Sequence, residues 1–150
     1  MRSCGIDVGQ QGAVALLADG KFSRLVDIPV DSSRELDSLA LFHLLLEWEP
    51  DLVVFENIFR PNQTIRFAGE VQAVCKILQV ESLMVAITSW KTAVLGRNTS
   101  DKKVSVDRCR ELFPDADLIR PGCRVSNPDR AEALLLAYYG SELRGGGTRK

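Results

Sequence analysis

Two apolar runs on either side of a Gly-x-x-Gly turn open the chain, in the stretch from Cys4 to Leu17. The pattern predicts a buried strand, a tight hairpin and a second strand, and Asp7 is the only charge in it, near the end of the first strand. A carboxylate on an apolar strand is unfavourable unless a cation or a hydrogen-bond donor compensates it. Gly9 and Gly12 leave room beside it for a large anionic ligand or a nucleic-acid backbone. The alternative is a hairpin whose aspartate caps its own turn.

The composition indicates one folding unit. The chain has 150 residues, 45% of them apolar, which is enough for one well-packed domain and too few for two. No window has the apolar length of a membrane span, and the polar Arg2 and Ser3 are unlike a signal peptide, so we expect a cytoplasmic protein with no membrane partner. Four widely separated cysteines and one histidine lack the spacing of a zinc site or a disulfide framework, so we expect reduced, mostly buried thiols.

Charge is distributed unevenly along the chain, although the net charge is only −1. Residues 20–56 contain 3 basic and 8 acidic side chains, a balance of −5, whereas residues 57–110 contain 9 basic and 4 acidic ones, a balance of +5. One half could therefore face a polyanion while the other faces water. The alternative is that these charges only solvate the outer faces of helices. We expect a domain over residues 1–143 and a flexible tail over 144–150.

The order of the apolar runs predicts an α/β fold, a central mixed five-stranded sheet flanked by helices. Three antiparallel strands come first, and two parallel strands that alternate with helices follow. The first helix takes its N-cap from residues 31–33, and the last takes Asn127 as N-cap and Pro128 as first residue. The predicted strands cover residues 2–8, 13–18, 22–28, 51–56 and 82–87. The predicted helices cover residues 34–48 and 63–78, with a short one from 88, one ending near 113 and one from 128.

Four carboxylates are predicted to meet at one edge of this sheet. Asp7 and Glu56 end two of the strands, and Asp129 and Glu132, three residues apart, share a face in the first turn of the last helix. The carboxyl ends of neighbouring strands share one edge, where a helix N-terminus can join them. Four acids without cations would repel one another, whereas Mg²⁺ or Mn²⁺ accepts oxygen ligands. The alternative is that the helical pair only complements the helix dipole.

Metal-assisted hydrolysis of a nucleic acid is the chemistry that this acidic edge predicts. Two divalent ions about 4 Å apart clamp the attacking and leaving oxygens of a phosphodiester in an in-line displacement. One ion would activate water and the other would stabilise the leaving 3′ oxygen. Neither a protein nucleophile nor a further cofactor is needed, so we expect two Mg²⁺ ions per site, with Mn²⁺ as a substitute.

Four short blocks resemble the signature blocks of RuvC-type Holliday junction resolvases, in the same order and at comparable separations. They are residues 5–9, 55–59, 89–91 followed by 101–103, and 127–133, and the resemblance extends to about Leu143. It is greatest to bacteriophage members, which would act in the host cytoplasm. The resemblance implies the RNase H-like fold of the retroviral integrase superfamily and a homodimer. It also implies paired symmetric nicks in branched DNA, the four-way junction, that leave 5′-phosphate and 3′-hydroxyl ends.

The same resemblance implies roles for individual residues. Four acids are implied as catalytic metal ligands: Asp7, Glu56, Asp129 and Glu132. Five further residues are implied as DNA contacts: Phe59, Arg60, Lys91, Lys102 and Lys103. Phe59 would act as an aromatic wedge near the junction centre, and Lys91 and Lys102 would act in catalysis on the scissile phosphate, although the sequence does not separate Lys102 from Lys103. The alternatives are a core phenylalanine and ordinary surface lysines.

The sequence departs from the family pattern at two positions. Val8 stands where the family has proline. Glu132 stands where bacterial members have aspartate, and this longer side chain leaves metal preference and rate open.

Two other functions remain as alternatives. Residues 5–9 also resemble the first phosphate loop of the actin and sugar-kinase ATPases, although those enzymes need a second related domain. Action on structured RNA is the other alternative, since a related bacterial family shares the fold.

Overall fold

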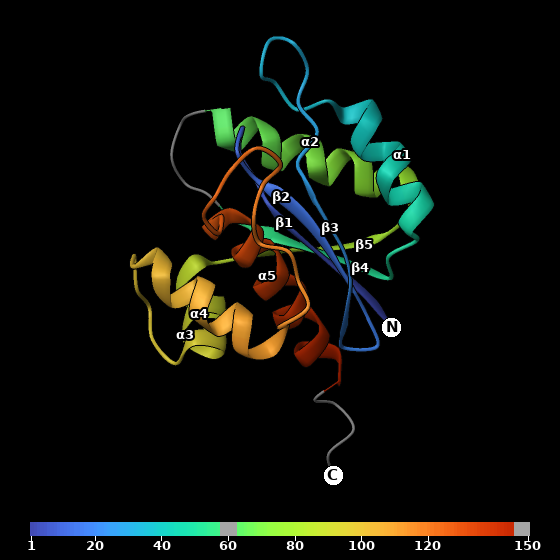
Figure 1. Ribbon diagram of the computed structural model, residues 1–150. Coiled ribbons are helices and arrows are strands. Elements are labelled where there is room, and N and C mark those ends of the chain that lie inside the picture. Colours follow the sequence, from blue (N-terminus) through green and yellow to red (C-terminus); the bar gives the residue numbers. More distant parts are fainter. Residues whose placement is uncertain (58–62, 146–150) are drawn as a thin grey trace.

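A five-stranded mixed sheet forms the centre of the protein (Figure 1). The computed structural model describes residues 1–57 and 63–145, apart from the side chains of Gln63 and Thr64, so residues 146–150 of the predicted tail lie outside it. The strands are β1 (Arg2–Asp7), β2 (Ala13–Ala18), β3 (Lys21–Asp27), β4 (Leu52–Glu56) and β5 (Glu81–Val85). Their order is β3-β2-β1-β4-β5, with antiparallel pairs among the first three strands and parallel pairs from β1 to β4 and from β4 to β5. The predicted fold class is confirmed.

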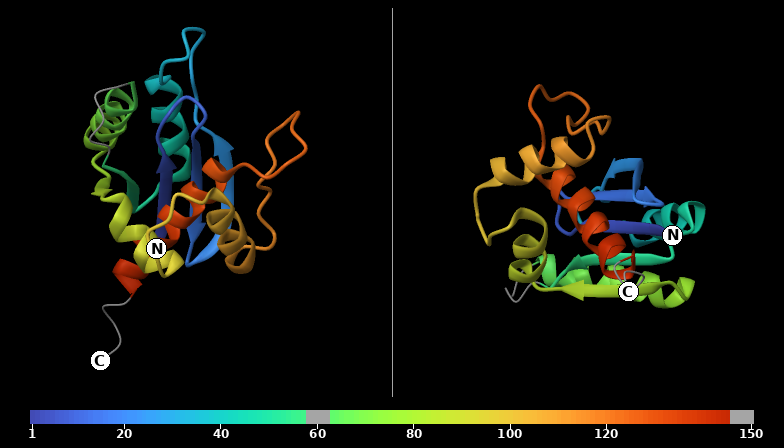
Figure 2. Two further views of the ribbon diagram at one scale, coloured as in Figure 1. Left: turned by 90° about the vertical axis from the view of Figure 1, so that its left-hand side faces the viewer. Right: turned by 90° about the horizontal axis from the view of Figure 1, so that it is seen from below.

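Helices cover both faces of the sheet (Figure 2). The helices of one face are α1 (Ser38–Trp48) and α2 (Gln63–Leu78), and those of the other are α3 (Ile87–Leu95), α4 (Lys102–Leu112) and α5 (Pro128–Gly145). Alternate strand residues point to opposite faces of the sheet. Val53 and Phe55 therefore pack in the core under α1 and α2, whereas Leu52 and Val54 pack in the core under α3, α4 and α5. In the described part of the chain, no helix is both long and apolar enough to cross a membrane.

α5 packs closely on β1 because a glycine removes the side chain at their contact. A Cβ atom on Gly5 would collide with the backbone of α5 at Ala133, so only glycine allows the two backbones to approach this closely. Ser3 Oγ donates a hydrogen bond of 2.7 Å to the carbonyl oxygen of Ala137, one turn further along the helix. The helix therefore runs antiparallel to β1, and its N-terminal turn lies at the carboxyl end of that strand.

Two predicted element boundaries differ from the structure by two residues or more. The first helix begins at Ser38, four residues later than predicted, and its N-cap is Asp37, whose carboxylate accepts a backbone N–H of the first turn at 2.9 Å. The predicted cap Asp31 instead accepts two backbone N–H groups of a local turn, because short polar side chains compete with the helix for these donors. The last strand ends at Val85, and Ile87, predicted as its final residue, begins α3.

The four cysteines, all within the described residues, are free thiols. Cys4, Cys75 and Cys109 are buried, as predicted, and Cys123 is exposed in the segment between α4 and α5. Burial raises the pKa of the Cys75 thiol to about 11 and that of Cys109 to about 12. Cys123 is therefore the thiol that a reagent in solution would reach first.

Candidate active site

Three of the four predicted carboxylates meet where β1 ends and α5 begins. Asp7 is the last residue of β1, and Asp129 and Glu132 lie in the first turns of α5. One oxygen from each side chain lies within 4.8 Å of the corresponding oxygens of the other two. The predicted N-cap of this helix is confirmed, since Asn127 Oδ1 accepts the backbone N–H of Arg130 at 3.0 Å. The close packing of α5 on β1 thus brings together acids that lie more than 120 residues apart in the sequence.

Asp7 is the least compensated member of this cluster. Its Oδ2 is buried and has no hydrogen-bond partner among the described residues. Burial raises the pKa of Asp7 well above its usual range, and the charges of Asp129 and Glu132 raise it further. Burial also raises the pKa of Asp129; the charge of Lys102 opposes that rise and the charge of Glu132 adds to it. An unpartnered buried oxygen among acids fits a divalent cation, which accepts such oxygens as ligands and removes their repulsion.

Glu56 lies at the same edge of the sheet but is not part of the three-carboxylate cluster. It ends β4, and its Oε1 accepts a 2.8 Å hydrogen bond from the indole Nε1 of Trp90, a fully buried residue of α3. Burial raises the pKa of Glu56, and the hydrogen bond from Trp90 opposes that rise. The charge of Glu56 contributes to the raised pKa of Asp7, so the two acids are close enough to interact. Trp90 is a site residue that sequence analysis missed, although it lies inside one of the four blocks.

Two lysines neutralise Glu132, which is almost fully buried. Lys91 Nζ lies 3.2 Å from Oε1 and Lys102 Nζ lies 2.7 Å from Oε2 of this glutamate. Ser105 Oγ donates a further hydrogen bond to Oε1 at 3.3 Å, and Lys91 also donates to the carbonyl oxygen of Thr99 at 3.2 Å. Burial lowers the pKa of Lys102, but the hydrogen bond and charge of Glu132 outweigh it and leave that pKa raised. Lys102 therefore meets the acidic cluster as a cation.

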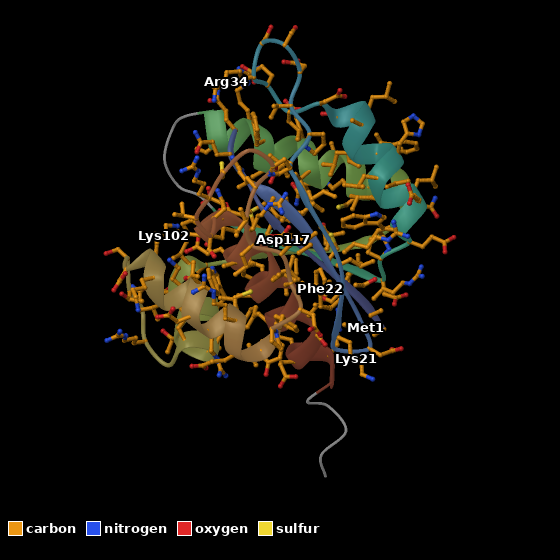
Figure 3. The ribbon with its side chains drawn as sticks, viewed as in Figure 1. Met1, Lys21, Phe22, Arg34, Lys102 and Asp117 are labelled. Atoms are coloured by element: carbon orange, nitrogen blue, oxygen red, sulfur yellow. The ribbon has the colours of Figure 1, made fainter. Side chains whose placement is uncertain are left out.

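Lys103 pairs with a residue outside the acidic cluster. Its Nζ lies 2.8 Å from Asp107, one turn along α4, and its side chain is 79% exposed. Lys102, by contrast, pairs with Glu132 of the cluster. Figure 3 labels Lys102 at the outer edge of the molecule, where α4 begins. Phe59 and Arg60, which were also predicted to contact DNA, lie outside the described residues.

An arginine pair that sequence analysis missed ties the start of α5 to the turn after β1. Arg130 Nε donates to Asp27 Oδ1 at 2.8 Å, and Arg120 Nε lies 3.3 Å from the same oxygen. Arg120 also donates to the carbonyl oxygens of Gln11 and Gly12, the latter at 3.1 Å. These contacts hold the first turn of α5 in place beside the hairpin formed by β1 and β2. Their partners are more than 90 residues apart in the sequence, so no local pattern could have indicated them.

The fold and the site together define an RNase H-like α/β domain with an acidic edge flanked by lysines. RuvC of Thermus thermophilus shares this fold, with a TM-score of 0.74 and 17% identity over 97% of each chain. A complex of T. thermophilus RuvC with a Holliday junction substrate gives a TM-score of 0.71 and 18% identity, covering 100% of this chain and 98% of that chain.

A viral protein has the same fold. The Fowlpox virus resolvase, in a complex with substrate Holliday junction DNA, gives a TM-score of 0.67 and 16% identity, covering 93% of this chain and 98% of that chain. No protein-family model and no curated protein sequence matches the chain. At these identities the likeness confirms the expected RuvC-type fold.

Proposed function

We propose that this chain is a metal-dependent, structure-selective endonuclease that resolves Holliday junctions and related branched DNA. One observation carries the proposal: the buried, unpartnered Oδ2 of Asp7 within a cluster completed by Asp129 and Glu132. Two structural neighbours, T. thermophilus RuvC and the Fowlpox virus resolvase, are complexes with Holliday junctions, which supports the same substrate class here.

The acidic edge has the donor set that Mg²⁺ or Mn²⁺ requires. Asp7, Asp129 and Glu132 would hold one ion, and Glu56 would contribute at the same edge to a second, since hard divalent cations prefer carboxylate oxygens. When bound, the ions stabilise the charge on the attacking and leaving oxygens of a phosphodiester. Trp90 fixes the orientation of the Glu56 carboxylate before any ligand arrives.

The lysines beside this edge would bind the reacting phosphate. Lys91 lies on α3 and Lys102 lies on α4, and both pair with Glu132. Their side-chain nitrogens therefore approach the carboxylates from the side of α3 and α4. In the complex they would orient the scissile phosphate and neutralise charge that develops on it, which fixed cations in a partly buried site do effectively. Cleavage would leave 5′-phosphate and 3′-hydroxyl ends.

Two copies of the chain would act together on one junction. A four-way junction has two equivalent strands to cut, and an isologous dimer presents two identical sites related by a two-fold axis. Paired nicks at symmetric positions would then separate the junction into two duplexes. A single copy carries one acidic cluster among its described residues, which is consistent with one nick per protomer.

Cleavage of defined substrates tests this proposal. Purified protein is incubated with end-labelled four-way junction, flap, linear duplex and structured RNA, in Mg²⁺, in Mn²⁺ and in EDTA, with Asp7→Asn as the inactive control. We expect symmetric nicks in the junction only with metal and only with Asp7 intact, and a dimer in sedimentation. Preferred cutting of RNA, or ATP hydrolysis without any cutting, would instead support one of the alternative functions.

A further inference from the structure

Residues 118–127, between α4 and α5, form a projecting hairpin. Ile119 and Ser126 form an antiparallel bridge, and the backbone N–H of Asn127 donates to the carbonyl oxygen of Leu118 at 2.6 Å. Gly122 turns the chain at the tip with a φ of +80°, a conformation that favours glycine. Figure 2 (left) shows the segment that contains this hairpin standing out from the rest of the molecule. We refer to residues 118–127 as the 118–127 hairpin.

The 118–127 hairpin is fastened at its base. Arg130 Nη1 donates to the carbonyl oxygens of Asp117 and Ile119 at 3.1 and 3.2 Å, and Arg110 Nη2 donates to Ser126 Oγ at 2.7 Å. The Leu118 side chain is buried in the core shared by α4 and α5. An element that is already ordered loses little conformational entropy when a partner binds to it. The hairpin is thus a preformed projection.

The chemistry of the hairpin suits a polyanion with an apolar component. It contains Arg120 and Arg124 and no acidic residue from position 118 to 128. Arg124 is exposed, and beside it Val125 has 75% of its surface exposed to solvent. Arginine next to an exposed apolar side chain matches duplex DNA, where guanidinium groups bind phosphates and apolar groups contact sugars or base edges in a groove.

The position of the hairpin relates it to the acidic cluster. It ends at Asn127, the N-cap of α5, two residues before Asp129. Near the other end of the hairpin, Arg120 donates a hydrogen bond to Gly12, in the turn that follows β1. One end of the hairpin therefore adjoins the turn after Asp7, and the other end adjoins the helix that carries Asp129. In Figure 2 (left) the hairpin and α2 lie on opposite sides of the sheet. DNA whose scissile phosphate lies at the cluster would pass close to the hairpin.

We propose that the 118–127 hairpin is a second DNA-binding element, which grips the duplex arm beside the cut through Arg124 and Val125. The inference rests on the proposed nuclease function, because it takes the cluster as the place where the DNA is cut. DNA is favoured over a second copy of the chain as the partner, because Arg124 is an exposed cation and the hairpin contains no acidic residue.

Site-specific cross-linking tests the contact directly, because Cys123 is the exposed thiol of the chain and lies in the hairpin. The Asp7→Asn protein is labelled at Cys123 with a maleimide photo-cross-linker and irradiated with uncut four-way junction in Mg²⁺. We expect cross-links to a duplex arm within a few nucleotides of the site where unaltered protein cuts, and none with the additional Cys123→Ser change. Cross-links between protomers in place of DNA cross-links would overturn the proposal and place the hairpin at a dimer interface.

Binding measurements on Arg124→Ala provide the second test, with Arg24→Ala as the matched control. Arg24 is a half-exposed arginine on β3 that pairs with Glu47 of α1. We expect Arg124→Ala to weaken junction binding roughly 5- to 10-fold and to lower the slope of log K against log salt by about 0.9, with an unchanged melting temperature. If the unaltered protein cuts junctions and both variants have the same affinity and the same slope, the hairpin contact is refuted and the nuclease function is not. Absence of cutting by the unaltered protein would refute the nuclease function instead.

Discussion

The indole N–H of Trp90 donates a 2.8 Å hydrogen bond to Oε1 of Glu56, so a fully buried aromatic side chain fixes the one predicted metal ligand outside the three-carboxylate cluster. The bond is formed between two buried side chains from α3 and β4, where loss of either partner leaves the other unsatisfied. Trp90 therefore links the packing of the core on one face of the sheet to the orientation of a carboxylate at the site.

Trp90→Phe keeps an aromatic ring, although a smaller one, and removes the N–H donor. We expect a loss of about 1–3 kcal/mol in the free energy of unfolding, because the Glu56 oxygen loses its partner, together with a higher metal concentration for half-maximal cleavage. Urea denaturation and a Mg²⁺ titration of junction cleavage measure the two effects. The matched control is Trp48→Phe, which alters the other tryptophan, in the core on the opposite face. A similar metal response from both variants would mean that Trp90 acts only in packing.

Asp7→Asn should separate cleavage from binding. The change removes a cluster carboxylate, so we expect cleavage to be abolished, while junction binding is kept or strengthened because a negative charge near the phosphate is lost. In EDTA the variant should also melt at a higher temperature, since a neutral amide avoids the burial cost and the repulsion by neighbouring acids that raise the pKa of Asp7. Cleavage at the unaltered rate would remove Asp7 from the site.

The stability of the metal-free protein should fall as the pH rises above the usual carboxyl range. Burial raises the folded-state pKa of Asp7, Glu56 and Asp129. Between the unfolded pKa of about 4 and these higher values, the folded state binds more protons than the unfolded state, so the free energy of unfolding decreases with pH. Urea melts in EDTA across this range measure the slope. Saturating Mg²⁺ should flatten it, and an equal slope with and without metal would contradict the ligand assignment.

Lys102 and Lys103 form a natural pair of test and control. Lys102 contacts Glu132 in the cluster, whereas Lys103 pairs with Asp107 in solvent. We expect Lys102→Met to reduce the cleavage rate by about 10²- to 10³-fold, the usual cost of removing one fixed donor at a developing charge. Lys103→Met should leave that rate nearly unchanged. Single-turnover cleavage of the junction compares them, and the reverse order would exchange the roles of the two lysines.

Gly5→Ala tests whether close packing of α5 on β1 positions the acids. The added Cβ would collide with backbone atoms at Ala133, so α5 must move away from the strand that carries Asp7. We expect a loss of about 1–3 kcal/mol in stability from overpacking, together with a large loss of cleavage. The control is Gly69→Ala on α2, where an added Cβ meets no atom within 4 Å. That change should stabilise the helix by about 0.5–1 kcal/mol. Thermal melts and cleavage assays compare the two.

Local sequence patterns predicted the type and order of the elements and placed the candidate site residues on them. The alternation of apolar residues predicted the strands, and Asn127 followed by Pro128 predicted the start of the last helix, because caps and periodicity depend on neighbours in the chain. For the same reason, the sequence placed Asp7 and Glu56 at strand ends and Asp129 and Glu132 on one helical face. The first helix was misplaced because Asp31 and Asp37 are equally good caps in isolation.

Only the tertiary structure decided which of these groups meet. The Trp90–Glu56 bond, the choice of Lys102 over Lys103 beside Glu132 and the ties from Arg120 and Arg130 to Asp27 all depend on how α3, α4 and α5 pack on the sheet. Such contacts join residues that are tens of positions apart, and their geometry is set by the cooperative packing of the core rather than by any local preference. The sequence therefore determined which residues are candidates for the chemistry, and the packed fold determined which of them meet.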